Sequence, residues 1–431
     1  MLHDRDFLKL WVGQTVSVFG TQITILAVPI VAALTLKVTP FEFGLLGTLE
    51  FLPFVLLSLP AGVWVDRLRR RPILIIGDLG RAVALSSIPI AFAFGLLTIW
   101  QLYLVAFLNG CLTVFFDVAY QSYLPSIVER DQLVEGNAKL EITRTTAQRI
   151  GPAVAGVLIT IVTGPIAVAV DAVSYAFSAV LVFWIRRPEP PIAPHHTATG
   201  KRPSMRVEIG DGLRYVTGHR WLRAIAATSG TSNLFAHMAD AILILYLVTE
   251  RGFSAALIGF AFSIGSIGVI AGALLTNRVT KVLGVGPMLV LCAAGFSIAW
   301  LPIAAAPDAL LFPALAGSIV ALGFFGVAWN INQVSLRQAI TPHRMQGKMN
   351  ATMRFIAWGT IPVGTIVGGF LGGVIGLHDT IWVGALGSVV GFLPVAFSSI
   401  RHIREMPTAV EDDASAPVVL EAWTAPGAVD E

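Results

Sequence analysis

Residues 61–72 read AGVWVDRLRRRP and are almost all that separates two long apolar runs. Each of these runs is long enough to cross a bilayer, which takes about 20 mostly apolar residues. A short basic connection between two such runs predicts a helical hairpin whose turn lies at a membrane surface. The stretch therefore indicates a protein built from helices that cross a membrane and return.

The composition supports a membrane protein. Of 431 residues, 55% are hydrophobic and 13% charged, with a mean hydropathy of +0.76. A soluble core could not bury that much apolar surface. Cys111 and Cys292 each lie inside an apolar run, which argues against a disulfide framework or a metal site, and we expect no cofactor. The net charge of +3 comes from loop arginines, so no nucleic-acid partner is expected.

Cutting the chain at its loop signals predicts an all-α membrane protein with twelve transmembrane helices. The expected spans are 9–36, 41–65, 73–97, 100–125, 138–163, 165–186, 220–248, 254–280, 284–305, 309–338, 345–375 and 379–400. The first apolar run is too long for a cleaved signal segment, so we expect it to remain in the mature protein.

The basic residues predict the orientation. Among 29 lysines and arginines, only Lys37 and Arg251 fall in loops on the odd-numbered side. The other loops and both termini should therefore face the cytoplasm, as the positive-inside rule requires. We expect a multi-pass protein of the inner (plasma) membrane.

The chain divides into two halves around its longest polar interval. We expect a six-helix half over residues 1–187, a cytoplasmic linker over 188–219, a second six-helix half over 220–404 and a disordered tail over 405–431. The first part of the linker is proline-rich and should be irregular. From about Ser204 its apolar residues form one helical stripe, which predicts a helix that either lies on the inner leaflet or is a solvated connector.

An internal repeat supports two halves. The tetrapeptide QSYL at 121–124 returns as QVSL at 333–336, an offset of 212 residues, which is about half of the chain. Ala61-Gly62 likewise returns as Ala271-Gly272, although the acidic pair that follows the first copy is replaced. Parallel six-helix repeats place a substrate site near the middle of the membrane, between the halves.

The hairpin at 61–72 resembles the signature loop between the second and third helices of major facilitator superfamily transporters. Gly62, Asp66, Arg67 and Arg71 match that pattern, while Arg69 stands where the family usually has a second glycine. The resemblance implies the major facilitator fold and a conformational gate in which this loop holds one of two alternating states. Replacing Asp66 with Asn should then favour the inward-open state. The alternative is that the arginines only obey the positive-inside rule.

Within the superfamily, residues 115–125 (FFDVAYQSYLP), followed by Asn137 and Arg144, resemble the branch of macrolide-efflux proteins and the enterobactin exporter. This resemblance implies proton-coupled export of an amphipathic small molecule, such as a drug or a siderophore. The acid that relatives often carry in helix one is missing, because Gly20 is followed by Thr21 and Gln22. The proton carrier must therefore be sought elsewhere.

Ionisable residues at membrane depth cost about 2.5–3.5 kcal/mol or more, so they are functional candidates. The candidates for proton coupling are Glu50, Asp117, His237 and Asp240. Glu50 and Asp240 are preferred, because a desolvated carboxylate can take up a proton on one side and release it when hydrated on the other. Glu50 could instead bond a carbonyl freed by a nearby proline, and His237 could simply be packed. Asp171 is expected nearer the outer end of helix six.

Two further groups complete the candidates. A structural ion-pair belt near the cytoplasmic helix ends is expected from Asp78, Arg81, Glu141, Arg144 and Arg354. Candidates for the substrate cavity are Gln22, Phe116, Asn233, Trp329 and Asn330, because amides in hydrocarbon need a partner and aromatic rings can stack on a ligand.

Other function classes fit less well. The chain has no Gly-x-x-x-x-Gly-Lys-Ser/Thr loop for ATP and no clustered catalytic or metal ligands, so neither a pump driven by ATP nor an enzyme is expected. A monomeric transporter of a small molecule, with protons as the second partner and the lipid bilayer around it, is the prediction. The alternative is an importer or facilitator of a small polar solute with the same fold.

Overall fold

The computed structural model describes residues 5–65, 68–128, 132–187, 189 and 205–407. Their regular elements are all helices, and twelve helical segments are long and apolar enough to cross a membrane. The first half contains α1 (Arg5–Ile30) with the π-helical turn η1 (Val31–Thr35), α2 (Pro40–Val65), α3 (Arg70–Ala93), α4 (Ile99–Ile127), α5 (Leu133–Val162) and α6 (Gly164–Phe183). The predicted fold class and number of spans are confirmed.

After the linker helix α7 (Met205–Gly218), two of the remaining spans are broken into two helices. The second half contains α8 (Arg220–Thr249), α9 (Ala255–Leu283), α10 (Val285–Ile298) with α11 (Leu301–Ala305), α12 (Leu311–Ala339), α13 (His343–Val374) and α14 (Leu377–Gly391) with α15 (Leu393–Ala396). A proline stands at the start of each second piece, Pro302 in α11 and Pro394 in α15. Proline has no N–H to donate, so it is favoured where a helix begins.

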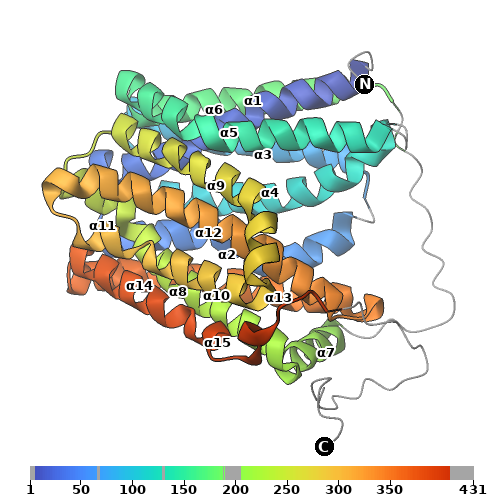
Figure 1. Cartoon of the computed structure of the whole chain (residues 1–431). Helices are drawn as coiled ribbons and strands as arrows, with labels where there is room; N and C mark the ends of the chain where they lie inside the picture. The colour runs from blue at the N-terminus through green and yellow to red at the C-terminus, as the bar shows by residue number, and fades with distance from the viewer. Residues whose placement is uncertain (1–4, 66–67, 129–131, 188, 190–204, 408–431) are drawn as a thin grey trace, which may run out of the picture.

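The helices pack into two groups that follow the order of the chain (Figure 1). In the first group α1 packs on α5 and α6, and α3 packs on α4 and α6; in the second, α8 packs on α13 and α14, and α9 on α12. Two seams join the groups, one between α2 and α13 and the other between α5 and α9.

The two ends of the bundle need names. We call the end where α2 and α6 finish, at Val65 and Phe183, the linker side, because the connection between the halves starts there. The opposite end, where α3 and α5 finish at Ala93 and Val162, is the far side.

The linker helix α7 is bound to the second half. Asp211 accepts a hydrogen bond from Lys348 Nζ at 2.9 Å, and a Cβ atom added at Gly212 would lie 3.0 Å from the carbonyl oxygen of Lys348. Val216 is buried, whereas Leu213 is exposed. Helix α7 thus docks on α13, and the apolar side chain of Leu213 remains on its exposed face. The expected irregular part of the linker (188 and 190–204) and most of the expected disordered tail (408–431) lie outside the described residues.

Candidate functional site

The seam between α2 and α13 is closed in its far-side part. Thr48 Oγ1 lies 2.8 Å from Thr365 Oγ1, so the two hydroxyls share a hydrogen bond between the halves. One turn further toward the far side, a Cβ atom on Gly44 would meet the Cα of Gly369 at 2.6 Å. The two backbones therefore touch at a pair of glycines, which no other residue type would allow.

The seam between α5 and α9 is equally tight. A Cβ atom on Gly259 would lie only 2.1 Å from the carbonyl oxygen of Pro152, and one on Gly156 would lie 2.4 Å from that of Ala255. The backbone N–H of Ala153 donates to Ser263 Oγ at 2.9 Å. These contacts lie between the far side and the middle of the bundle, so the halves are sealed there.

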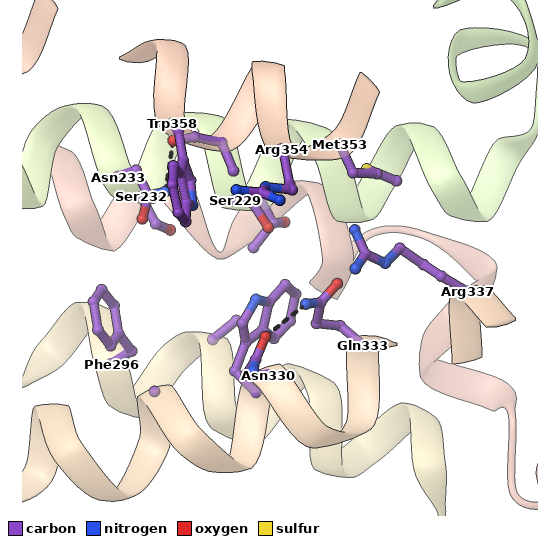
Figure 2. Close-up of a pocket in the computed structure, with 15 residues that line it drawn as sticks. Ser229, Ser232, Asn233, Phe296, Asn330, Gln333, Arg337, Met353, Arg354 and Trp358 are labelled. Atoms are coloured by element: carbon purple, nitrogen blue, oxygen red, sulfur yellow. Dashed lines mark hydrogen bonds between the residues drawn. The ribbon is translucent and has the colours of Figure 1, made fainter. Parts of the chain in front are cut away.

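A cavity of about 370 Å³ lies toward the linker side, within the second half (Figure 2). Side chains of α8, α10, α12 and α13 line it. They include Ser229, Ser232, Asn233, Phe296, Trp329, Asn330, Gln333, Arg337, Met353, Arg354 and Trp358. A concave, mostly apolar space with a few polar groups is the usual form of a small-molecule site.

Three of the expected cavity residues line this space, namely Asn233, Trp329 and Asn330. The Asn233 amide donates to the carbonyl oxygen of Ala357 at 2.7 Å, and Asn330 Oδ1 accepts from Gln333 Nε2 at 3.2 Å. The amides are thus held in place by α13 and α12.

The other two expected cavity residues lie elsewhere. Phe116 is only 4% exposed and packs in the core of the first half, because its ring lies beneath the Arg81 guanidinium. Gln22 is half-buried against α5, since a Cβ atom added at Gly151 would meet its side chain. The sequence interpretation did not include Ser232, Gln333 or Arg337, although Gln333 and Arg337 are one turn apart on α12 and could have been found by that spacing.

A smaller recess of about 130 Å³ extends the site toward the other half. Phe54 and Ser58 of α2 line it together with Arg354 and Trp358, which also line the larger cavity. The rings of Phe54 and Trp358 lie edge to face, with centroids 6.4 Å apart. Arg354 and Trp358 therefore lie where the cavity approaches the α2–α13 seam.

The first half contains a buried ion pair. Arg81 Nη2 donates to Asp78 Oδ1 at 2.5 Å, and the side chains are 5% and 0% exposed. The guanidinium lies 4.2 Å from the ring centroids of both Phe116 and Tyr175. A charged pair without water needs such support, because its desolvation otherwise exceeds the attraction. This pair matches the expected structural ion pair, but it lies in the core of the half.

Asp171 lies in the same core. Its residue is fully buried, and its carboxylate accepts hydrogen bonds from Thr24 Oγ1 and, at 3.0 Å, from Ser174 Oγ. Among the described residues, Asp171 has no ion-pair partner within 4.0 Å. The sequence interpretation noticed Asp171 but did not make it a coupling candidate, because linear position does not reveal which face of α6 meets α1 and α3.

The coupling candidates differ in exposure. His237 Nδ1 lies 3.7 Å from Asp240 Oδ2, with side chains 28% and 54% exposed. The ring of Phe51 lies 6.3 Å from that of His237. Glu50, the residue before Phe51, is half-buried, and its carbonyl oxygen would lie 2.7 Å from a Cβ atom added at Gly110 of α4. Asp117 is exposed on α4. The structure thus pairs His237 with Asp240 and places the backbone of Glu50 against α4.

The remaining expected ion pairs are of two kinds. Glu141 and Arg144 form a pair at 2.6 Å on the surface of α5, with side chains 59% and 54% exposed. Arg354 has no acidic partner within 4.0 Å among the described residues; its guanidinium lies 4.7 Å from the Trp358 ring centroid. Arg354 lines the cavity, and the described lining of the cavity includes no carboxylate. Arg354 is therefore not part of an ion-pair belt.

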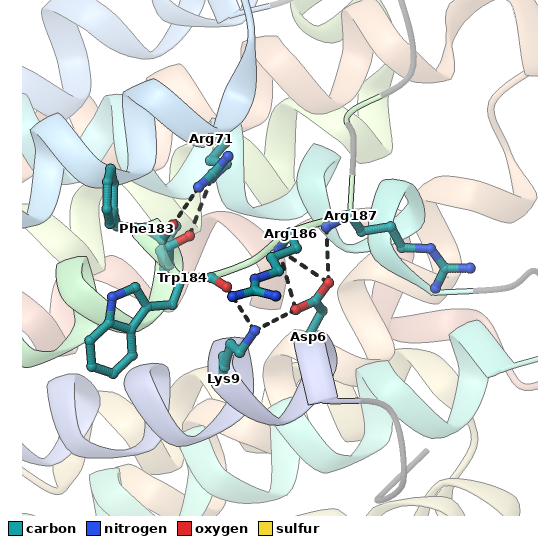
Figure 3. Close-up of polar contacts among 8 residues, drawn as sticks. Asp6, Lys9, Arg71, Phe183, Trp184, Arg186 and Arg187 are labelled. Carbon is teal, nitrogen blue, oxygen red and sulfur yellow. Dashed lines mark hydrogen bonds and ion pairs between the residues drawn. The ribbon is translucent and has the colours of Figure 1, made fainter.

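The signature loop is only partly described. Gly62 lies in the last turns of α2, and Asp66 and Arg67 lie outside the described residues. Arg71, at the start of α3, donates from Nε to the Val182 carbonyl at 3.3 Å and from Nη2 to the Phe183 carbonyl (Figure 3). Arg71 thus fastens the start of α3 to the end of α6.

A second set of contacts ties α1 to the same place (Figure 3). Asp6 accepts from Lys9 Nζ at 2.7 Å and from the backbone N–H of Arg187 at 2.9 Å, and Lys9 also donates to the Trp184 carbonyl at 2.7 Å. The linker-side ends of α1, α3 and α6 are therefore held together as one unit.

A family profile described as "Transmembrane secretion effector" matches residues 2–426, so the chain belongs to this family. It is a multi-pass membrane protein of the major facilitator superfamily. The chain is 26% identical to "Multidrug efflux pump Tap" of Mycolicibacterium fortuitum, over 90% of this chain and 94% of that protein.

Two other relatives match over a shorter length. "Uncharacterized MFS-type transporter YfiS" of Bacillus subtilis is 23% identical over 64% of each chain. "Macrolide efflux protein A" of Streptococcus pyogenes is 26% identical over 54% of this chain and 56% of its own. The matches thus span less than two thirds of either relative.

Solved structures share the fold. A bacterial homologue of the iron transporter ferroportin in an inward-facing state has a TM-score of 0.71 at 15% identity, over 91% of this chain and 98% of that chain. A D-xylose–proton symporter has a TM-score of 0.65 at 12% identity, over 90% and 96%. The expected superfamily is confirmed by these comparisons together with the family match.

Proposed function

We propose that this chain exports amphipathic small molecules across the plasma membrane in exchange for protons, by alternating access. The observation that carries the proposal is that the seams are closed between the far side and the middle of the bundle, while the cavity lies toward the linker side. If the linker side is cytoplasmic, as the basic loops indicate, the cavity faces the compartment from which an exporter collects its substrate. The efflux pumps among the relatives support the same direction.

The proton would be carried by Glu50 or Asp240, with Asp117 as the next candidate. Glu50 and the His237–Asp240 pair lie on α2 and α8, two helices from opposite halves that pack together, so a change in their hydration would accompany a movement of the halves. A carboxylate that alternates between dry and wet surroundings alternates between holding and releasing a proton.

Inverted membrane vesicles test this function. With a proton gradient, vesicles containing the protein should accumulate members of a panel of drugs and siderophores against their gradients, and dissipating the gradient should stop the accumulation. Glu50→Gln or Asp240→Asn should abolish uphill transport while leaving exchange without a gradient.

If both variants pump at wild-type rates, the carrier is not among these two. If the gradient has no effect on any substrate, the protein is a facilitator, and if a polar solute enters cells only with the protein, it is an importer.

A further inference from the structure

We propose that the cavity of the second half binds its substrates through an anionic group, so that the exported molecules are amphipathic aromatic anions. That the bound molecules are exported rests on the proposed function. The binding chemistry follows from the cavity itself. Two charged side chains line the cavity, Arg337 and Arg354, and the described lining includes no acidic residue. A site with two cations and no counter-charge attracts a negative group.

Arg337 forms no ion pair with any residue that the structure describes. It stands two residues before the end of α12, and it is half-buried. Its Nε atom is inaccessible and has no hydrogen-bond partner, and no described acid lies within 4.0 Å of its guanidinium. A cation without an acid beside it keeps an uncompensated positive charge, and a negative group bound in the cavity would compensate that charge.

Arg354 offers the other contact. Its guanidinium carbon lies 4.7 Å from the centroid of the Trp358 ring, which is a cation–π contact. The N–H donors point outward from the edge of the plane, and they suit a carboxylate, a sulfonate or a phosphate. Figure 2 shows both guanidinium groups directed into the same space, from α12 and from α13.

The rest of the cavity suits an aromatic body. Trp329 and Phe296 line it beside the amides of Asn233 and Gln333. Its volume of about 370 Å³ is in the lower part of the range for small-molecule sites, so it would hold a molecule of two or three rings. A cationic drug would instead meet two like charges, and a neutral one would leave both guanidinium groups without a counter-charge.

A matched set of probes tests the inference: 2-naphthoate, 2-naphthamide and 2-naphthylmethylammonium carry one aromatic skeleton with a negative, a neutral and a positive group. Their affinities for the full-length protein in lipid nanodiscs can be measured by calorimetry. We expect 2-naphthoate to bind about 10-fold or more tightly than 2-naphthamide, the difference that a charge-assisted hydrogen bond provides, and the ammonium probe not to compete. Equal binding of 2-naphthoate and 2-naphthamide, or a preference for the ammonium probe, would overturn the inference.

Variants locate the anion. Arg337→Gln and Arg354→Gln should each weaken 2-naphthoate binding by about 10-fold while changing 2-naphthamide binding by less than about 2-fold. Arg337→Lys keeps the charge and should retain the preference for the anion, which separates lost charge from lost folding. The control is Arg214→Gln, on an exposed position of α7, which should bind all three probes as the wild type does. If the two cavity variants keep wild-type affinity for 2-naphthoate, these arginines do not hold the anion.

Because this assay measures binding without transport, it separates the inference from the proposed function. Selective anion binding without gradient-driven accumulation in the inverted vesicles would contradict proton-driven export and leave the inference standing. Export of neutral and cationic drugs without any binding of 2-naphthoate would contradict the inference and leave export standing.

Discussion

Gly44→Ala should open the far side of the molecule. The new Cβ atom would lie 2.6 Å from the Cα of Gly369, 2.6 Å from the carbonyl oxygen of Thr365 and 2.9 Å from the N of Gly369. All three are backbone atoms on α13, so no change of rotamer can make room. The methyl group therefore fits only if α2 and α13 move apart.

The size of the effect follows from the cost of overpacking, which is about 1–3 kcal/mol at a tightly packed site. This cost falls only on the state in which the seam is closed, so it shifts the equilibrium between the two states by roughly 5- to 150-fold. Gly373→Ala is the matched control on α13, because nothing lies within 4 Å of a Cβ atom added there.

Double electron–electron resonance measures this shift. In a variant without Cys111 and Cys292, one pair of nitroxides would be placed on the far side at Leu96 and Leu310, both exposed. A pair on the linker side would report the opposite movement. In Gly44→Ala the far-side distances should lengthen and the linker-side distances shorten, and in Gly373→Ala both should stay as in the wild type. Unchanged distances in Gly44→Ala would refute the idea that this glycine contact closes the far side.

Three further predictions concern stability. Arg81→Leu leaves Asp78 buried without its cation and should lower the free energy of unfolding by about 3–5 kcal/mol; an unchanged apparent Tm in detergent would argue against a buried pair. Asp211→Asn breaks the partly exposed pair with Lys348 and should cost less than about 1 kcal/mol by the same measurement, so a large loss would show that α7 depends on this contact. Burial lowers the pKa of His219, which accepts hydrogen bonds from two backbone N–H groups at the start of α8. As the pH drops, the histidine of the unfolded state takes up a proton first, so the stability of the folded state should fall below about pH 6.5. Asparagine can also cap the start of a helix, so His219→Asn should keep the cap and remove this pH dependence. A pH dependence that persists in this variant would contradict the assignment to His219.

The fold could be predicted because the signals that define it are local. The length of an apolar run can be read from the sequence without knowing how the helix packs, so the twelve spans were found. The ninth and twelfth spans are each broken where a proline, Pro302 or Pro394, starts a new helix. The docking of α7 was not predicted, because the pair between Asp211 and Lys348 joins residues far apart in the chain.

The site was predicted only in part. Amides are conspicuous in apolar helices, so Asn233 and Asn330 were found. Phe116 was assigned to the cavity because its type suits a ligand, but the direction in which a side chain of α4 points is decided by the packing of Arg81. Arg337 was missed for the opposite reason: a basic residue near a helix end on the cytoplasmic side is what the positive-inside rule already explains.

The measurement that tests proton-driven export most directly is the movement of protons driven by substrate alone. Proteoliposomes containing the purified protein and a dye that reports luminal pH are prepared with the same pH on both sides, and a transported substrate from the vesicle assay is then added outside. If the chain exchanges substrate for protons, substrate entry should drive protons out and raise the luminal pH, and the double variant Glu50→Gln/Asp240→Asn should take up substrate with no change in pH. Substrate uptake by the wild-type protein without any change in luminal pH would contradict proton-coupled export.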